Sequence, residues 1–165
     1  MSVRKLLRWP DKRLRTAAQP VDEITDEIRA LWDDMIETMD AMPGVGLAAP
    51  QMGVMLQLAV VDASEARDRR HRLANPVILD TSAVMREYEE ASPNLPGVSA
   101  KISRPRGVTV RFLDESCVWT RRDFVGLEAT SVQHQIDHLQ GRMYFDRLGK
   151  VKRDMLLRKA RKLKG

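Results

Sequence analysis

A pair of histidines at helical spacing, His134 and His138, constrains this chain more than any other sequence feature. Residues four apart lie one turn apart on the same face of an α-helix, so both imidazoles can reach a single ion. Gly141 follows as a candidate C-cap. The surrounding apolar residues recur at near-helical spacing: Leu127, Val132, Ile136 and Leu139. This register predicts a metal site, past or present; two unrelated histidines that happen to fall four apart are the alternative.

The residue directly after the first histidine departs from the pattern of metal hydrolases. In H-E-x-x-H enzymes, a Glu at this position takes a proton from the metal-bound water. Gln135 stands there instead, and a neutral amide cannot accept the proton. The sequence therefore keeps the geometry of a metal hydrolase without the group that carries out its proton chemistry.

A second segment, residues 44–51, reads Gly-Val-Gly-Leu-Ala-Ala-Pro-Gln. Its glycines and small residues permit tight turns and the close approach of backbone to a ligand or another strand. Taken alone, the segment is equally compatible with a helix C-cap followed by a loop.

Together these segments resemble the peptide deformylases, the metal hydrolases that remove the formyl group from the initiator methionine of new bacterial proteins. Three family motifs occur in order: G-x-G-L-A-A-x-Q at 44–51, E-G-C-L-S before an apolar residue and Pro at 90–96, and Q-H-E-x-D-H-L at 133–139. The first matches fully, the third matches except at Gln135, and the interior of the second is rewritten. The resemblance covers essentially the whole chain. It implies an α+β deformylase-like fold with β-sheets around a central H-x-x-x-H helix.

The resemblance implies site roles that this chain fills only in part. The family holds its metal with a Cys and the two His, but Ser92 stands at the Cys position, and a neutral hydroxyl binds divalent metals poorly. Pro93 stands where a backbone N–H stabilises the oxyanion, and proline has no N–H. Gln51, the other oxyanion donor, is retained. A divalent metal is implied, Fe²⁺ in the family with Zn²⁺ or Ni²⁺ as alternatives, and the missing thiolate predicts weak occupancy.

The implied pocket for the methionine side chain also departs from the family. Thr130 and Ser131 stand where the residues are usually apolar or Cys, and a more polar wall binds a Met side chain less well. The resemblance places these residues along the pocket: Val45, Gly46, Leu127, Thr130, Ser131 and His134.

The expected losses are large. Removing a general base costs roughly 10²–10⁴ in rate and removing an oxyanion donor roughly 10²–10³. We therefore expect a degenerate paralogue with lost or strongly reduced activity, which keeps the fold and peptide or ribosome binding. One alternative is a weak or altered metal-dependent amide hydrolase, completed by Ser92 or a carboxylate. The other is a metal-free ribosome- or protein-binding module.

Composition fits one compact domain at residues 1–149. A chain of 165 residues is long enough to bury a core. No apolar run approaches the ~20 residues of a membrane span, and the charged start lacks the apolar stretch of a signal peptide. The one cysteine, Cys117, is compatible with a reducing cytoplasm, and we expect it in a strand, buried or half-buried. We expect a cytoplasmic monomer without membrane contact.

The periodicity predicts one long amphipathic helix from about residue 24 to Pro43-Gly44. A charged loop at residues 67–71 should leave His71 in solvent, not as a ligand. Five strands are expected: 56–61, 76–79, 84–88, 108–113 and 118–125.

The tail, residues 150–165, reads as a separate basic helix. Eight Lys and Arg face a single acid, Asp154, and such a helix is attracted to phosphate backbones without sequence specificity. The resemblance implies docking on the ribosome near the tunnel exit, where nascent formyl-peptides emerge. A solvated helix that only aids solubility is the alternative. The expected contacts are Lys152, Arg153, Arg158, Lys159, Arg161 and Lys162.

Overall fold

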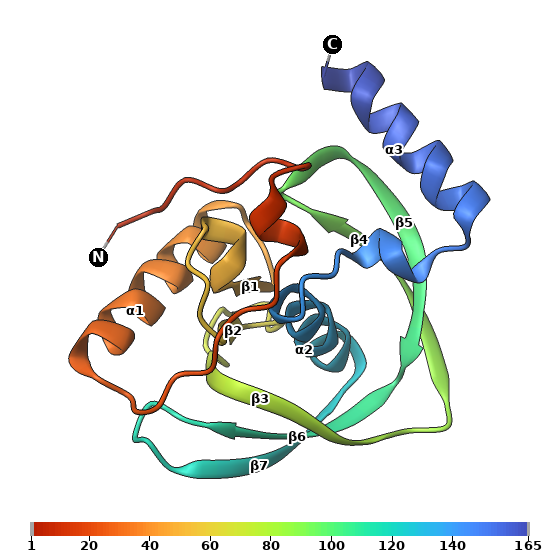
Figure 1. The fold of residues 1–165 in the computed structure, drawn as a ribbon. Helices are drawn as coiled ribbons and strands as arrows, with labels where there is room; N and C mark the ends of the chain where they lie inside the picture. Colours follow the sequence, from red (N-terminus) through yellow and green to blue (C-terminus); the bar gives the residue numbers. More distant parts are fainter. Residues whose placement is uncertain (1, 165) are drawn as a thin grey trace.

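The structure is a computed structural model that describes residues 2–164. Seven strands, three α-helices and three short 3₁₀ helices (η) make up the part of the chain it describes (Figure 1). In chain order they are η1 (Lys12–Arg15), α1 (Asp26–Ala41), β1 (Gly46–Ala48), η2 (Ala49–Met52), β2 (Leu58–Val61), β3 (His71–Thr81), β4 (Met85–Ser92), β5 (Leu95–Pro105), β6 (Gly107–Leu113), β7 (Trp119–Val125), α2 (Gly126–Leu139), η3 (Tyr144–Arg147) and α3 (Lys150–Lys164).

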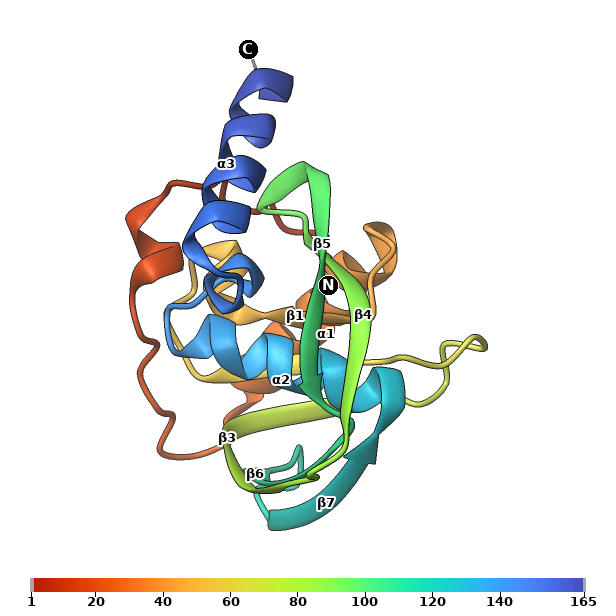
Figure 2. The same ribbon diagram turned by 90° about the vertical axis from the view of Figure 1, so that its right-hand side faces the viewer.

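Two antiparallel sheets surround α2. The larger sheet has the order β1-β2-β3-β6-β7, and β4 and β5 form a separate long hairpin. In Figure 1, α2 lies near the centre, with β3, β6 and β7 below it and the hairpin on the right. Figure 2 shows the hairpin crossing in front of α2 while α3 leaves the body at the top. The expected α+β fold with a central helix and a C-terminal helix is therefore confirmed.

The boundaries of α1 follow from its sequence. The Thr25 side chain accepts a hydrogen bond from the backbone N–H of Ile28 at 3.2 Å, which caps the first turn. Asp26 and Glu27 lie in that turn, where negative charge complements the helix dipole. The apolar stripe of the helix includes Trp32, which is fully buried against β1 and β2.

The core forms separate clusters around the central helix. Ile136 of α2 packs against the inner faces of β6 and β7. Another cluster joins the hairpin to η3 and α3, through residues such as Leu95, Phe145 and Leu156. Because α3 buries Leu156 and Ala160 in that cluster, it is packed onto the body along one side.

The sequence pattern does not predict two of the strands, β1 and β5. β1 has three residues, too few to show an alternating period. β5 spans eleven residues, but its apolar positions do not alternate strictly, because both faces of the hairpin are only partly covered. The motif at 90–96 lies at the tip of the β-hairpin, where β4 ends at Ser92 and β5 begins at Leu95. In the described part of the chain, no helix combines the length and apolarity that crossing a bilayer requires.

Candidate active site

Both histidines point from α2 into the interior. His134 is 8% exposed and His138 is 1% exposed, and their Nε2 atoms lie 3.2 Å apart. Two nitrogens that bind one tetrahedral ion at about 2.0–2.1 Å lie roughly 3.3 Å from each other. The spacing therefore suits either one hydrogen bond between the rings or joint binding of a single ion.

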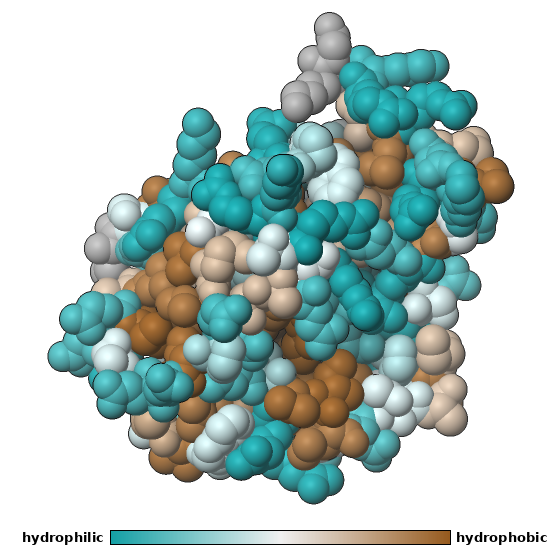
Figure 3. Space-filling view, viewed as in Figure 1, coloured by the Kyte–Doolittle hydropathy of each residue, from teal (hydrophilic) through white to brown (hydrophobic). Residues whose placement is uncertain are grey.

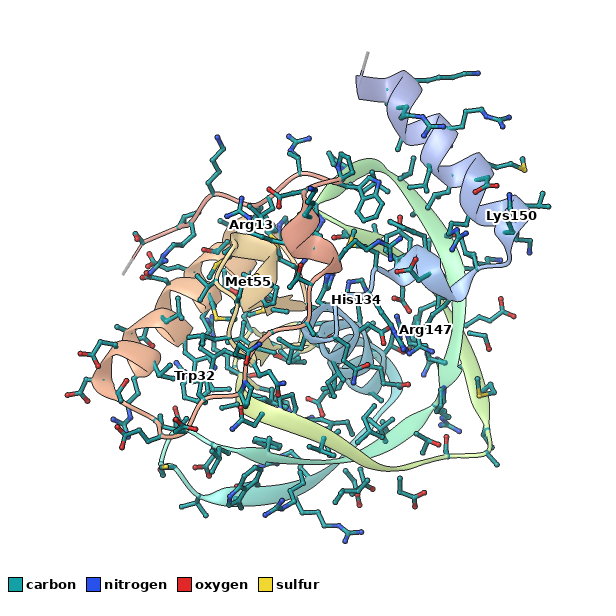
Figure 4. All side chains as sticks on the ribbon, viewed as in Figure 1. Arg13, Trp32, Met55, His134, Arg147 and Lys150 are labelled. Atoms are coloured by element: carbon teal, nitrogen blue, oxygen red, sulfur yellow. The ribbon has the colours of Figure 1, made fainter. Side chains whose placement is uncertain are left out.

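A buried chain of charged groups fixes the orientation of His134. The Nδ1 atom of His134 lies 2.8 Å from Glu90 Oε1, and Arg104 donates to both oxygens of Glu90 at 2.7 and 3.0 Å. Arg104 also donates to Asp137 at 2.9 Å. Arg147 of η3 closes the outer end with two bonds to Asp137, and Figure 4 labels His134 and Arg147 at the two ends. A carboxylate on the second ring nitrogen is the support typical of metal-binding histidines.

These interactions set the charges of the buried groups. Burial acts most strongly on Glu90 and would raise its pKa, but the hydrogen bonds and charges of His134 and Arg104 together hold that pKa below its ordinary value. Burial likewise raises the pKa of Asp137, and Arg147 and Arg104 outweigh it. Burial lowers the pKa of His138 well below its ordinary range, and the charge of His134 adds to this shift. His138 is therefore neutral at pH 7, the form in which imidazole binds metals.

The sequence does not predict this network of buried charged groups. In the sequence, Glu90 serves only to align the second motif with the family. Nothing in the spacing of Arg104 indicates that it is buried. The available signal is chemical: a carboxylate that faces a core needs a partner of opposite charge. The Arg104 side chain, at 0% exposure, is that partner.

The hairpin tip (residues 92–95) brings two expected site residues together through a third. Asn94 Oδ1 accepts hydrogen bonds from Gln51 Nε2 at 2.8 Å and from the Ser92 hydroxyl at 3.1 Å. The Gln51 Oε1 atom accepts from the backbone N–H of Ala48 at 2.9 Å. These contacts fix the amide of Gln51. Because an amide NH₂ has two donors, one N–H remains for a ligand in the cavity.

Gln135 lies against Gly46 on the opposite wall. A Cβ built on Gly46 would fall 2.5 Å from Gln135 Nε2, so only glycine permits this approach. Gln135 Oε1 is buried without a hydrogen-bond partner. A buried acceptor without a donor is costly, which marks this oxygen as a group that a ligand N–H can satisfy.

A cavity of about 440 Å³ opens between α2 and the hairpin tip. Every pocket residue expected from the sequence borders it, and so do Ser92, Pro93 and Gln51. Ser131 contributes less polarity than expected, because its hydroxyl donates to Val45 O at 2.9 Å. His138 does not border the cavity, whereas His134 does. The lining residues on the two walls include Val45, Gly46, Leu127, Thr130, Ser131, His134 and Gln135, with Gln51, Ser92 and Pro93 opposite.

The donor set does not match a catalytic three-ligand metal centre. The two imidazoles are placed for one ion, but the hydroxyl of Ser92 is neutral and bonded to Asn94. Among residues 2–164, no group of three or more His, Cys, Asp and Glu side chains is arranged to hold an ion. Since catalytic sites of this kind use three protein ligands, two imidazoles provide an incomplete set.

A sequence model of the family described as "Polypeptide deformylase" matches residues 3–154. The chain belongs to the polypeptide deformylase family. It is similar to a peptide deformylase from Afipia carboxidovorans, with 42% identity over 161 residues that cover 96% of this chain and 94% of the relative. It is also similar to peptide deformylase 1 of Burkholderia multivorans, with 40% identity, 99% of this chain and 90% of the relative.

Solved deformylase structures agree with this assignment. The structure of a peptide deformylase from Legionella pneumophila superposes with a TM-score of 0.91 at 38% identity, over 99% of this chain and 96% of that one. The Ehrlichia chaffeensis peptide deformylase in complex with actinonin gives a TM-score of 0.91 at 35% identity, over 98% of each chain. The whole deformylase fold is therefore present in this chain.

Two expectations outside the deformylase motifs were wrong. His71 does not lie free in solvent: it begins β3, is half-buried and places Nε2 2.9 Å from a Glu128 oxygen. The strand starts earlier than the charged loop suggests because residues 71–74 pair with β2. Cys117 is exposed and lies in the turn between β6 and β7, with φ at 60°. Because β6 ends at Leu113 and β7 begins at Trp119, neither strand includes Cys117.

Helix α3 presents its charges outward. The expected contact residues Lys152, Arg158, Lys159, Arg161 and Lys162 are exposed, whereas Arg153 is half-buried with its guanidinium 4.0 Å from Asp146. Lys150, labelled in Figure 4 at the start of the helix, pairs with Asp154 at 2.8 Å.

Proposed function

We propose that this chain binds N-formylmethionyl peptides in the cavity between α2 and the hairpin tip, and hydrolyses them at least about 100-fold more slowly than an intact deformylase. One observation carries this proposal. Ser92, Pro93 and Gln135 border the same cavity, and each lacks the group that the family's reaction uses at its position. The three changes act on one reaction, so their costs overlap and do not simply multiply.

We propose that the cavity residues bind the peptide but do not complete the proton transfer. Gln51 donates its free N–H to the formyl oxygen, because the other hydrogen bonds of its side-chain amide hold it in place. Gln135 accepts a hydrogen bond from the peptide but cannot take a proton. Leu127 and Val45, which are partly exposed at the cavity, contact the methionine side chain, while Thr130 and Ser131 make that contact less apolar.

The relatives named above are ordinary peptide deformylases, and their names say nothing of lost activity. Support for a degenerate copy comes only from the residues at the site. The family resemblance implies a divalent metal, and His134 and His138 are the residues that would hold it.

A weak metal-dependent amide hydrolase is the second candidate. The observation that favours it is the 3.2 Å spacing of the Nε2 atoms, with Glu90 in place behind His134. This candidate requires a third ligand from the peptide or from solvent.

Turnover of formyl-Met-Ala-Ser separates the two candidates. The protein is assayed with added Fe²⁺, Ni²⁺ or Co²⁺ beside an intact deformylase, and the metal content of the same sample is measured. We expect a rate at least ~100-fold below that of the intact enzyme, with substoichiometric metal after dialysis against a mild chelator. A rate within about tenfold would contradict the proposal. Slow turnover that scales with bound metal would favour the second candidate.

We further propose that residues 1–149 form the deformylase unit and that α3 docks the protein on the ribosome, in the cytoplasm and as a monomer. Support comes from the exposed basic residues of α3. Cosedimentation with ribosomes at about 50 and 200 mM salt tests the docking, because binding through phosphates weakens steeply over this range.

A further inference from the structure

The charge of this chain is concentrated in two segments far apart in sequence. Residues 2–16 carry six Lys and Arg and one acid, and residues 150–164 carry eight and one. The remainder therefore carries 14 basic and 21 acidic residues, although the whole chain has a net charge of +5. The protein is thus strongly basic at its two ends and acidic between them.

The fold brings the two basic segments side by side. Leu7, Trp9 and Leu14 of the N-terminal segment share one apolar cluster with Leu156 and Ala160 of α3. A groove of about 310 Å³ runs between the two segments. Its lining includes Arg8 and Trp9 on one side, and Ala160 and Leu163 on the other. In Figures 1 and 2 the N-terminal segment reaches the hairpin tip beside α3.

Several cations of this surface have no acidic partner. Arg8 and Lys12 are exposed and form no ion pair within residues 2–164, unlike Arg13, which pairs with Asp11, and Arg15, which pairs with Asp146. On α3 the same is true of five residues: Lys152, Arg158, Lys159, Arg161 and Lys162. In Figure 3, hydrophilic side chains cover most of the upper part of this face.

We infer that Arg8 and Lys12 join α3 in one composite surface that binds the phosphate backbone of RNA. This inference rests on the proposed ribosome docking through α3 and extends its contact area to the N-terminal segment. Arg8 lines the groove between the two segments, and both segments carry exposed cations without an acidic partner in the described residues. Such a surface suits a chain of regularly spaced phosphates. A lipid surface fits less well. The exposed apolar residues of α3, Val151, Met155 and Leu163, are interspersed with exposed basic residues and form no continuous apolar face to enter a bilayer, while Leu156 and Ala160 face the body.

Fluorescence anisotropy with a labelled 24-nucleotide RNA hairpin tests the inference across a salt series from about 50 to 200 mM. Three double variants of the full chain are compared: Arg8→Gln/Lys12→Gln, Arg158→Gln/Lys159→Gln, and the control Arg121→Gln/Arg122→Gln. The control removes two exposed arginines of β7 that form no ion pair in the described residues. Urea unfolding of each variant confirms that the fold is kept.

We expect the first two variants to weaken binding about 10- to 100-fold at low salt and to reduce the slope of log K against log salt by about 1.8, or 0.9 per lost contact. The control should change neither quantity. If the Arg8/Lys12 variant behaves like the control while the α3 variant is impaired, the composite surface is refuted and docking by α3 stands. If both variants bind like the control, the proposed docking fails as well. Binding to phosphatidylserine vesicles with equal sensitivity, without RNA binding, would also overturn the assignment.

Discussion

The two walls of the cavity differ in what they have kept. On α2, a buried network of Glu90, Arg104 and Asp137 supports His134. The His138 ring hydrogen-bonds only to His134, and its Nδ1 is buried without a partner in the described residues. At the hairpin tip, Asn94 accepts hydrogen bonds from both Gln51 and Ser92. The α2 wall thus holds both histidines but also Gln135, whereas the hairpin tip carries Ser92 and Pro93.

The difference follows from the cost of change on each side. Removing one member of a buried ion network leaves an uncompensated charge, at about 3–5 kcal/mol. Exchanging a neutral residue at a hairpin tip costs far less when the new side chain finds partners. The network is therefore held in place by the stability of the fold, whether or not the site is active. Its presence therefore does not test whether the site is active; that test falls on Ser92, Pro93 and Gln135.

The largest expected effect comes from restoring the altered groups together. The variant Ser92→Cys/Pro93→Leu/Gln135→Glu should raise kcat/KM for formyl-Met-Ala-Ser by about 10²-fold or more, because it returns a ligand, an oxyanion donor and a base. Gln135→Glu alone should stay near the parent, since it leaves no third metal ligand. Robust turnover by that single variant would show that the hairpin tip does not limit the reaction.

The supporting network should dominate stability. Arg104→Met leaves the carboxylates of Glu90 and Asp137 without their shared partner and should lower the free energy of unfolding in urea by about 3–5 kcal/mol. The matched control Arg121→Met removes an exposed arginine of β7 and should change it by less than about 0.5 kcal/mol. Equal losses in the two variants would remove the contrast between the walls.

A substitution at the hairpin tip should change the metal affinity, and this effect should be of intermediate size. Ser92→Cys in a Cys117→Ser background adds a single thiolate beside the two imidazoles, and should raise Zn²⁺ affinity by on the order of 100-fold in chelator competition. His138→Ala in the same background should abolish the gain. If the unmodified chain already holds Zn²⁺ as firmly as the Ser92→Cys variant, Ser92 is not the missing ligand.

The smallest effect concerns the N-terminal segment that holds the tip, where Trp9 N–H donates to Asn94 O at 2.8 Å. This segment is tied to α1 at Asp34, which accepts bonds from Ser2 N–H at 2.7 Å and from Arg4 at 2.8 Å. The Ser2 N–H and the Arg4 guanidinium, in that order, lower the pKa of Asp34. The stabilisation is therefore complete above the unfolded pKa near 3.9 and is lost as the pH falls below it.

Asp34→Asn should accordingly cost about 1 kcal/mol in urea unfolding at pH 7. The difference between the two proteins should shrink as the pH falls below about 3.9. A difference that is independent of pH would mean that the ionised carboxylate does not hold the segment.

The sequence by itself determined the features that depend on local spacing. The four-residue interval places His134 and His138 on one helix face, and the apolar period with the stop at Pro43-Gly44 predicts α1. The sequence alone also shows that Ser92 has no thiolate, Gln135 no carboxylate and Pro93 no backbone N–H; the catalytic roles of these positions stay a prediction from the family resemblance.

Only the tertiary structure decided which distant side chains meet. Glu90 and His134 are 44 residues apart, Arg104 and Asp137 are 33 apart, and Gln51 and Asn94 are 43 apart. No local period encodes these contacts. The first two arise because the hairpin folds across α2 (Figure 2) and buries Glu90, Arg104 and Asp137 there, and the third joins η2 to the hairpin tip. The joint basic surface has the same origin, since the packing of Trp9 and Leu156 in one apolar cluster brings the two ends of the chain together.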